Sequence, residues 1–195
     1  MIAAIILAAG LSSRTKGFNK LLLNYKGKKI IKHSVKSILS SKINHMVVVL
    51  GKNKEKIKKE IPKSKNISFV YNSNYKQGMA SSIIVGMNSL PKETTFFFIS
   101  LADMPEIKSI HYNKMITASK KNPKLPIVPF YKSQQANPVL FPMDFKKKLA
   151  ILKGDGGAKT ILKKTKIIKI IFTSNAFVKD LDTLEDFNKN YKIYY

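Results

Sequence analysis

Short apolar segments alternate with stretches of helical periodicity along the first 120 residues of this chain. The apolar segments, which we expect to be strands buried on both faces, are residues 2–7, 46–50, 67–71 and 96–101. Between and after them we expect helices at residues 31–39, 54–60, 79–90 and 107–120. Apolar residues recur on one face of the helices at 31–39 and 79–90, whereas the helix at 54–60 is short and polar. This alternation predicts a mostly parallel central sheet with helices on both faces.

The second half of the chain is less regular. We expect strands at residues 125–130, 138–141, 166–172 and 177–181, and helices at residues 143–152, 158–164 and 184–191. Residues 21–25 are expected to be extended and to end in a turn at Lys26-Gly27. No linker composition separates two parts, so residues 1–195 are expected to form one domain.

The composition narrows the class of protein. The net charge is +25, but the lysines are spread along the whole chain and aromatic residues do not interleave with a basic stripe, so no nucleic-acid partner is expected. A positive field that concentrates anionic substrates is the expected consequence. There are no cysteines, the first predicted strand begins at residue 2, and no apolar run approaches a membrane span. We therefore expect a cytoplasmic protein without membrane contact.

A turn of small residues, Ala8-Ala9-Gly10, follows the first predicted strand, and a polar loop with two hydroxyls and several cations comes next. Such a turn exposes backbone N–H groups that can hold a polyphosphate. The spacing matches neither a Walker A loop nor a dinucleotide fingerprint. Arg14 is the only arginine in the chain, which suggests a position that needs a planar, bidentate phosphate ligand, and Lys20 ends the loop.

Asp103 directly follows the strand predicted at residues 96–101, and ligands bind beyond the carboxyl ends of parallel strands. A magnesium ion held by one or two carboxylates and substrate phosphates suits this position, although a helix-capping aspartate is the alternative. Asp182, at the end of a late strand, is a candidate second ligand or a local cap. The three histidines show no ligand spacing, and we expect them to be structural or exposed.

Several sequence blocks together resemble the MobA-like nucleotidyltransferases, and most closely the molybdenum cofactor cytidylyltransferases. They occur in the order of that family and cover nearly the whole chain. In sequence, the blocks are Leu7-Ala-Ala-Gly-Leu-Ser-Ser-Arg14, Asn19-Lys20-Leu-Leu-Leu23, Asn72-x-x-Tyr75-x-x-Gly78-Met79-x-x-Ser82, Leu101-Ala-Asp103-Met-Pro105, Asn137-Pro-Val-Leu-Phe141, Leu152-Lys-Gly-Asp155-Gly-Gly-Ala158 and Asp180-Leu-Asp182-Thr-Leu-Glu-Asp186.

The resemblance implies a three-layer, Rossmann-like α/β nucleotidyltransferase fold that uses Mg²⁺. It also implies transfer of a nucleotidyl group from a nucleoside triphosphate to the terminal phosphate of molybdopterin or its molybdenum-bearing form, with release of pyrophosphate. The implied triphosphate ligands are the loop from Leu7 through Ala8, Ala9 and Gly10 to Ser12, with Arg14 and Lys20. The implied metal ligands are Asp103 and Asp182, the nucleoside ligands Asn72, Gly78 and Ser82, and the ligand on the pterin side Asn137. A molybdenum hydroxylase is an implied partner.

The resemblance implies the identity of the nucleotide base and of the acceptor through only a few positions. The cytidylyl branch resembles this chain in reading Ala-Ala-Gly at the turn, where the guanylyl branch reads Ala-Gly-Gly, so Ala9 favours CTP. The chain departs from the family at Thr15-Lys16, where small residues are usual, and at Gln134-Gln-Ala136, where many relatives have a glycine. Leu184 and Lys159 replace a common proline and arginine.

Other functions stay open at this point. One is guanylyl or adenylyl transfer, and another is transfer to a sugar phosphate or other phosphorylated acceptor. A third is an accessory protein that binds the cofactor for a molybdenum hydroxylase without catalysis. The presence of Arg14, Lys20 and Asp103 favours catalysis, because a carrier needs no metal carboxylate.

Overall fold

The computed structural model describes residues 1–11 and 19–177. Its main sheet has the strand order β10-β7-β9-β6-β1-β4-β5, with the short β8 paired to β7. In chain order the strands are β1 (Ile2–Ala8), β2 (Asn24–Tyr25), β3 (Lys28–Lys29), β4 (His45–Leu50), β5 (Ile67–Tyr71), β6 (Phe96–Leu101), β7 (Ile127–Tyr131), β8 (Gln134–Gln135), β9 (Val139–Pro142) and β10 (Ile168–Phe172). Strands β2 and β3 form a separate antiparallel hairpin.

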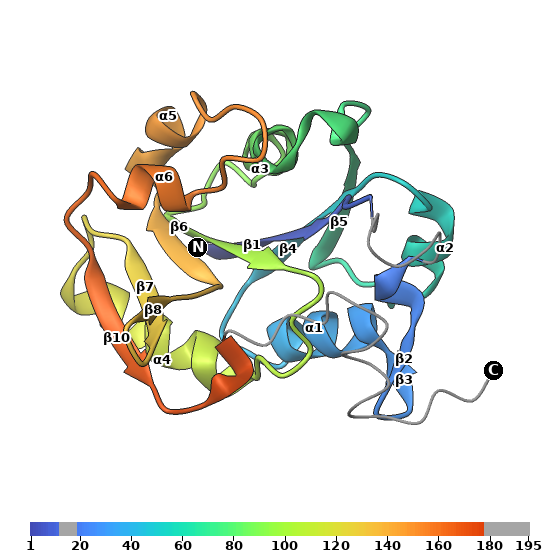
Figure 1. The fold of residues 1–195 in the computed structure, drawn as a ribbon, viewed down its shortest axis with the longest axis horizontal. Coiled ribbons are helices and arrows are strands. Elements are labelled where there is room, and N and C mark those ends of the chain that lie inside the picture. Colours follow the sequence, from blue (N-terminus) through green and yellow to red (C-terminus); the bar gives the residue numbers. More distant parts are fainter. Residues whose placement is uncertain (12–18, 178–195) are drawn as a thin grey trace.

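Helices cover both faces of this sheet (Figure 1). The helices are α1 (Ile30–Leu39), α2 (Lys54–Lys59), α3 (Met79–Asn88), α4 (Ser109–Lys121), α5 (Lys146–Leu149) and α6 (Lys159–Leu162), with 3-10 turns η2 (Lys20–Leu22), η3 (Tyr75–Gln77), η4 (Met143–Phe145) and η5 (Asn175–Phe177). Buried residues of α1, α2 and α4 pack on one face, and those of α3, α5 and α6 pack on the other. The protein is therefore a three-layer α/β structure.

Strand β1 lies at the centre of the sheet because every side chain in it is apolar and can be buried on either face. It pairs in parallel with β4 on one side and with β6 on the other. Alternate residues point to the two cores: Ile6 packs with α1 and α4, and Ile5 packs with α3. The carboxyl ends of β1, β4 and β6 consequently meet at one edge of the sheet, where the segments that follow them are brought together.

The predicted alternation of strands and helices and the mostly parallel sheet are confirmed. Two local predictions are wrong. Residues 20–22 form a 3-10 turn in place of an extended segment, because the Asn19 side chain caps it by accepting a hydrogen bond from the Leu21 N–H at 3.0 Å. The helix expected at residues 143–152 is divided into η4 and the single-turn α5. The strand expected at residues 138–141 is confirmed as β9, which is antiparallel to both of its neighbours in an otherwise mostly parallel sheet.

Two of the later predictions fall on the undescribed part of the chain. The helix at residues 184–191 lies outside the described residues, as does most of the strand at residues 177–181. Phe177 itself is the last residue of η5. Among the helices that the structure describes, none has the length and apolarity needed to span a lipid bilayer.

Candidate functional site

The turn after β1 combines buried small residues with an open glycine. Ala8 and Ala9 are almost completely buried, and the carbonyl of Leu7 accepts a hydrogen bond from the N–H of Ala102, which follows β6, at 3.3 Å. Gly10 is exposed, and no described atom lies within 4 Å of the position that a Cβ would take there. The turn therefore offers open space beside a backbone that is anchored to β6. Ser12 and Arg14 lie outside the described residues.

Ala9 packs inward, against the residue that follows β4. A Cβ on Gly51 would lie 2.7 Å from the Ala9 carbonyl oxygen and 2.9 Å from the Ala9 Cβ, so the Ala9 methyl occupies the space that Gly51 leaves. The methyl belongs to the core shared with α3. Any influence of Ala9 on the choice of base, which the resemblance implies, would therefore act through the position of the backbone.

Lys20 and Asp103 form an ion pair at this edge of the sheet. Lys20 begins η2, and Asp103 follows β6, so the fold joins two residues that are 83 positions apart in the sequence. Both side chains are mostly buried, with 19% and 15% of their surface exposed. Lys20 contacts Oδ2 of Asp103, whereas Oδ1 is buried and has no hydrogen-bond partner in the described part of the chain.

The unpaired oxygen of Asp103 fits a hard divalent cation. A buried carboxylate oxygen without a donor is costly in free energy, and Mg²⁺ is bound by carboxylate oxygens together with substrate phosphates and water. Residues 1–11 and 19–177 contain no group of three acidic, histidine or cysteine side chains that would enclose a metal by itself. Further ligands of an ion at Asp103 would therefore come from substrate phosphates or from residues outside these ranges. Asp182 lies outside the described residues.

Asn72 and Ser82 lie together at the junction between β5 and α3. Asn72 is 1% exposed; its amide nitrogen donates to the hydroxyls of Ser81 and Ser82, both at 2.9 Å. Its amide oxygen accepts a hydrogen bond from the N–H of Asn74 at 3.0 Å. These contacts fix the course of the chain from the strand into the helix. The two residues are brought together, but their polar atoms serve this junction.

Gly78 holds the start of α3 against the Gly154-Asp155-Gly156-Gly157 segment. Its φ is +101°, and an added Cβ would lie 2.4 Å from the carbonyl carbon of Gly154. The N–H of Ala80 donates to the carbonyl oxygen of Gly154 at 3.0 Å. A side chain at residue 78 would therefore separate two backbones that are in direct contact, and the sequence signal for this contact is the pair of glycine-containing blocks.

A pocket of about 290 Å³ opens beside this junction. Apolar side chains from α3, β6 and β9 line one part of it, and its polar lining includes three carboxamides and two charged groups. The apolar residues include Met79, Ile83, Ile99, Leu101 and Val139, and the polar ones are Gln134, Gln135, Asn137, Asp155 and Lys159. Asn137 is thus placed in the pocket, and Leu101 connects the pocket to Asp103, two residues further along.

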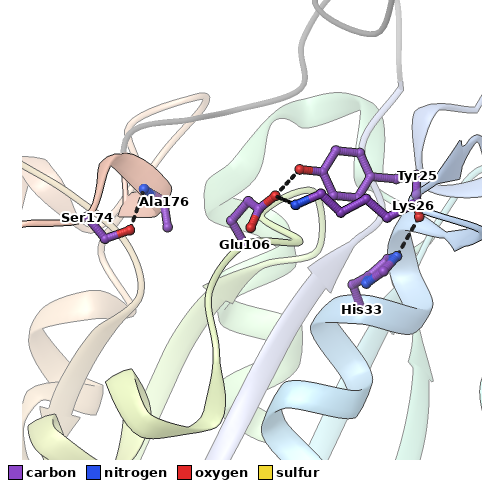
Figure 2. A network of polar contacts seen from close by, with 6 residues as sticks. All are labelled: Tyr25, Lys26, His33, Glu106, Ser174 and Ala176. Carbon is purple, nitrogen blue, oxygen red and sulfur yellow. Dashed lines mark hydrogen bonds and ion pairs between the residues drawn. The ribbon is translucent and has the colours of Figure 1, made fainter. Parts of the chain in front are cut away.

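The structure adds residues that the sequence reasoning did not select. Glu106, three residues after Asp103, accepts hydrogen bonds from the Tyr25 hydroxyl and from the Lys26 ammonium group, the latter at 2.6 Å (Figure 2). Two features of the sequence could have identified Glu106: acidic residues are rare, with only 11 in the chain, and it directly follows the Asp103-Met-Pro block. The pairing with Tyr25, 81 residues away, had no local signal.

The described histidines have structural surroundings. Burial, with the nearby charges of Lys108 and Lys114, lowers the pKa of His111, whose ring packs against Phe172 and Phe177. Burial also lowers the pKa of His45, which bonds to Ser68 at 2.9 Å. His33 contacts the backbone carbonyl of Tyr25 at 2.7 Å. None of the three contacts Asp103 or Lys20 through a described hydrogen bond.

Solved structures with the same fold include a protein of Mycobacterium tuberculosis H37Rv, Rv0371c. It is 20% identical to this chain, with a TM-score of 0.84 and coverage of 97% of this chain and 96% of the other. Another structure of that protein, in complex with manganese, has a TM-score of 0.78. At this identity the likeness shows the fold alone.

Curated relatives differ in what their names say they act on. The purine catabolism protein PucB of Bacillus subtilis is 26% identical, over 96% of this chain and 94% of its own length. The molybdenum cofactor cytidylyltransferase of Escherichia coli K12 is 27% identical, over 65% of this chain and 64% of its own length. The CTP:phosphoglutamine cytidylyltransferase of Campylobacter jejuni is 35% identical, but over only 52% of this chain and 43% of its own length.

The family is shown by a match that covers most of the sequence. Residues 4–168 match the profile of the MobA-like NTP transferase domain. The matched region begins in β1 and ends at the start of β10. It includes the turn at Gly10, the Lys20–Asp103 pair, the β5–α3 junction and all of the pocket lining except Phe177. The chain therefore belongs to the MobA-like NTP transferase family.

Proposed function

We propose that this protein transfers CMP from CTP to the terminal phosphate of molybdopterin or of its molybdenum-bearing form. A phosphate oxygen of the acceptor forms a bond to the α-phosphorus of CTP. The bond between that phosphorus and the oxygen bridging to the β-phosphate breaks, and pyrophosphate leaves with the electron pair of that bond. No covalent enzyme intermediate is needed, so the protein contributes positioning and charge neutralisation.

The observation that carries this proposal is the buried Oδ1 of Asp103, which has no hydrogen-bond partner among residues 1–11 and 19–177 and lies beside the ammonium group of Lys20. It lies on the loop that follows β6, and the open turn at Gly10 follows the neighbouring β1. On this proposal the backbone from Leu7 to Ser12, with Arg14 and Lys20, binds the triphosphate. The strong positive charge of the chain favours the approach of both anionic substrates.

Asp103, with Asp182 as a proposed second ligand, would hold Mg²⁺ next to the bound phosphates. When bound, the ion neutralises charge on the phosphate oxygens and so favours departure of pyrophosphate. Lys20 occupies Oδ2 of Asp103, so Oδ1 is the oxygen that would bind the metal. The pair therefore fixes the orientation of the carboxylate before substrate arrives.

CTP is the proposed donor for two reasons. The turn reads Ala8-Ala9-Gly10, as in the cytidylyl branch that the sequence resembles. Two of the relatives, from E. coli and C. jejuni, are named as cytidylyltransferases. Asn72, Gly78 and Ser82 support the nucleoside side in this proposal by fixing the β5–α3 junction through their contacts with each other and with Gly154.

The pocket supports a flat, heteroaromatic acceptor. Its apolar wall suits a ring system, and carboxamides both donate and accept hydrogen bonds, as the edge of a pterin requires. Asn137 and Lys159 supply a donor and a positive charge for the acceptor phosphate. A polyhydroxylated sugar would leave the apolar wall formed by Ile83, Ile99 and Val139 with poorer contacts.

The test is incubation of the purified protein with Mg²⁺, molybdenum cofactor and each of CTP, GTP and ATP in turn, with measurement of pyrophosphate release. We expect release with CTP at a kcat/KM at least about tenfold above that with GTP. Equal or faster turnover with GTP contradicts the cytidylyl assignment. The same assay with phosphoglutamine and with a sugar phosphate in place of the cofactor tests the acceptor.

The accessory function would give a different result. A cofactor carrier for a molybdenum hydroxylase would bind the cofactor and release no pyrophosphate with any nucleotide. The Lys20–Asp103 pair argues against a carrier without catalysis, because binding of an organic cofactor needs no such arrangement. Binding of the cofactor should be measured on the same preparation as pyrophosphate release, so that an inactive sample is not mistaken for a carrier.

A further inference from the structure

The loop that carries Asp103 is attached to the rest of the protein at both of its ends. At the start, the carbonyl of Ala102 accepts a hydrogen bond from the buried Ser34 hydroxyl of α1 at 2.9 Å. At the end, the side chain of Ile107 is buried in the same core as Tyr25 and α1. Between these points, the two carboxylates of the loop, Asp103 and Glu106, both contact residues of the segment from Lys20 to Lys26.

Two donors from the described residues contact the same oxygen of Glu106. The Tyr25 hydroxyl and the Lys26 ammonium group both contact Oε1, the latter at 2.6 Å, as Figure 2 shows. Hydrogen bonds to an ionised carboxylate are about twice as strong as neutral ones. The side chain of Glu106 is 23% exposed and that of Lys26 is 50% exposed, so the tyrosine supplies the shielded donor and the lysine the solvent-exposed one.

Tyr25 is itself held rigidly. Its ring is 1% exposed, and it packs edge-on against the ring of His33 at a centroid distance of 5.5 Å. Its backbone carbonyl contacts Nε2 of His33 at 2.7 Å, so α1 fixes both the ring and the main chain (Figure 2). With 36 basic residues in the sequence, a carboxylate finds a cation at many places. A buried tyrosine hydroxyl at a fixed point is rarer than a lysine, so it can hold Glu106 at one defined position.

We infer that Tyr25 and Glu106 are positioning residues that fix the Asp103 loop for metal binding. This inference rests on the proposed function, since it concerns the geometry of the same carboxylate. Lys20 sets the rotation of the Asp103 carboxylate, and the Tyr25–Glu106 contact sets the backbone of its loop. The β2–β3 hairpin thereby becomes part of the metal site without contributing a ligand.

The experiment measures Mn²⁺ binding directly, by electron paramagnetic resonance of free Mn²⁺ in the presence of saturating CTP, together with the unfolding temperature. Loss of a group that orients a metal ligand typically lowers metal affinity by about 10- to 100-fold. Accordingly, we expect Tyr25→Phe to raise the Kd for Mn²⁺ about tenfold. Glu106→Ala should have the same effect, and the double variant should match the single ones, because each of the three variants removes the Tyr25–Glu106 contact.

Two further variants separate positioning from stability. Tyr112→Phe also removes a fully buried hydroxyl, which is 2.8 Å from Ser100 in β6, but leaves the loop contacts intact. It should lower the unfolding temperature and change the Kd for Mn²⁺ by less than about twofold. Glu106→Gln keeps an acceptor for Tyr25 and loses only the charge, so it should restore most of the affinity that Glu106→Ala loses.

The outcomes distinguish this inference from the proposed function. If Tyr25→Phe lowers the unfolding temperature as Tyr112→Phe does and leaves the Kd for Mn²⁺ unchanged in an active enzyme, Tyr25 is only structural and the inference fails alone. If the unaltered protein neither binds Mn²⁺ with CTP nor releases pyrophosphate, both the inference and the proposed function fail.

Discussion

The edge formed by β1 and β6 differs from the junction between β5 and α3, although sequence resemblance places site residues in both. At the first, Gly10 has open space around it and Asp103 keeps a buried oxygen without a partner among the described residues. At the second, Gly78 is in backbone contact with Gly154, and the Asn72 amide is bonded to two serines. Within the described part of the chain, the first region has one buried oxygen without a partner and room for a ligand, whereas the polar groups of Asn72 in the second are hydrogen-bonded.

This difference separates two reasons for a residue to occur in a functional motif. Polar groups that are left unpaired inside a protein carry a cost in free energy that a ligand can offset. Polar groups that pair with each other stabilise the protein whether or not a ligand is bound. On this view the β1–β6 edge is the reactive region, and the β5–α3 junction is the support that keeps the pocket and α3 in place.

The largest expected effect is at Asp103. Asp103→Asn keeps the shape of the side chain but removes the charge that pairs with Lys20 and that would bind the metal. We expect kcat to fall by about 10²- to 10³-fold, because groups that stabilise charge at a reacting centre contribute on that order. Pyrophosphate release under saturating substrates measures it, and Asp144→Asn, at an exposed carboxylate in η4, is the control. Full activity in Asp103→Asn would show that the β1–β6 edge is not where the reaction takes place.

Gly78 should affect stability. Gly78→Ala places a Cβ 2.4 Å from Gly154 on a backbone with φ of +101°, so we expect a loss of about 3 kcal/mol in the free energy of unfolding. Denaturant unfolding measures it. The control is Gly154→Ala, which has a φ of +58° but no described atom near the added Cβ, and should cost about 1–2 kcal/mol. Equal losses in the two variants would mean that the contact between the segments adds nothing.

The sequence predicted the strands and helices of the first half well, because each is a local pattern. Residues 67–71 and 96–101 were expected as strands and form β5 and β6 with the same bounds. The order of strands beyond β6 was not predictable in this way. Nothing in the sequence of β9 indicates that it lies antiparallel between β6 and β7, since that depends on contacts made by the whole sheet.

The candidate site shows the same limit. The turn at Gly10 and the carboxylate at Asp103 have local signals, namely small residues after an apolar strand and an acidic residue after another. The Tyr25–Glu106 contact joins positions 81 residues apart, and the buried unpaired state of Asp103 Oδ1 depends on the atoms around it. Such properties arise from packing, which a pattern of residue types does not contain.

Gly10 tests whether the β1–β6 edge, where described residues leave open space, binds the nucleotide. Gly10→Ala adds a methyl to a free space and to a backbone outside the left-handed region, so the free energy of unfolding should stay the same or rise slightly. If the triphosphate lies against this turn, the methyl should weaken CTP binding by about tenfold, through lost approach to the backbone N–H groups. Calorimetric titration with CTP measures the affinity. Unchanged affinity would show that the nucleotide lies elsewhere.

Ser82 should show the smallest effect, and it tests the junction most directly. Ser82→Ala removes one of the two hydroxyls that accept from Asn72, so we expect a loss of about 1 kcal/mol in stability and a KM for CTP within about twofold of normal. Ser81→Ala is the matched control, because Ser81 accepts from the same amide and also donates within the loop. A fivefold rise in KM at unchanged stability would mean that the Ser82 hydroxyl contacts the nucleotide. In that case the junction would be part of the binding surface, and the distinction between reactive edge and support would fail there.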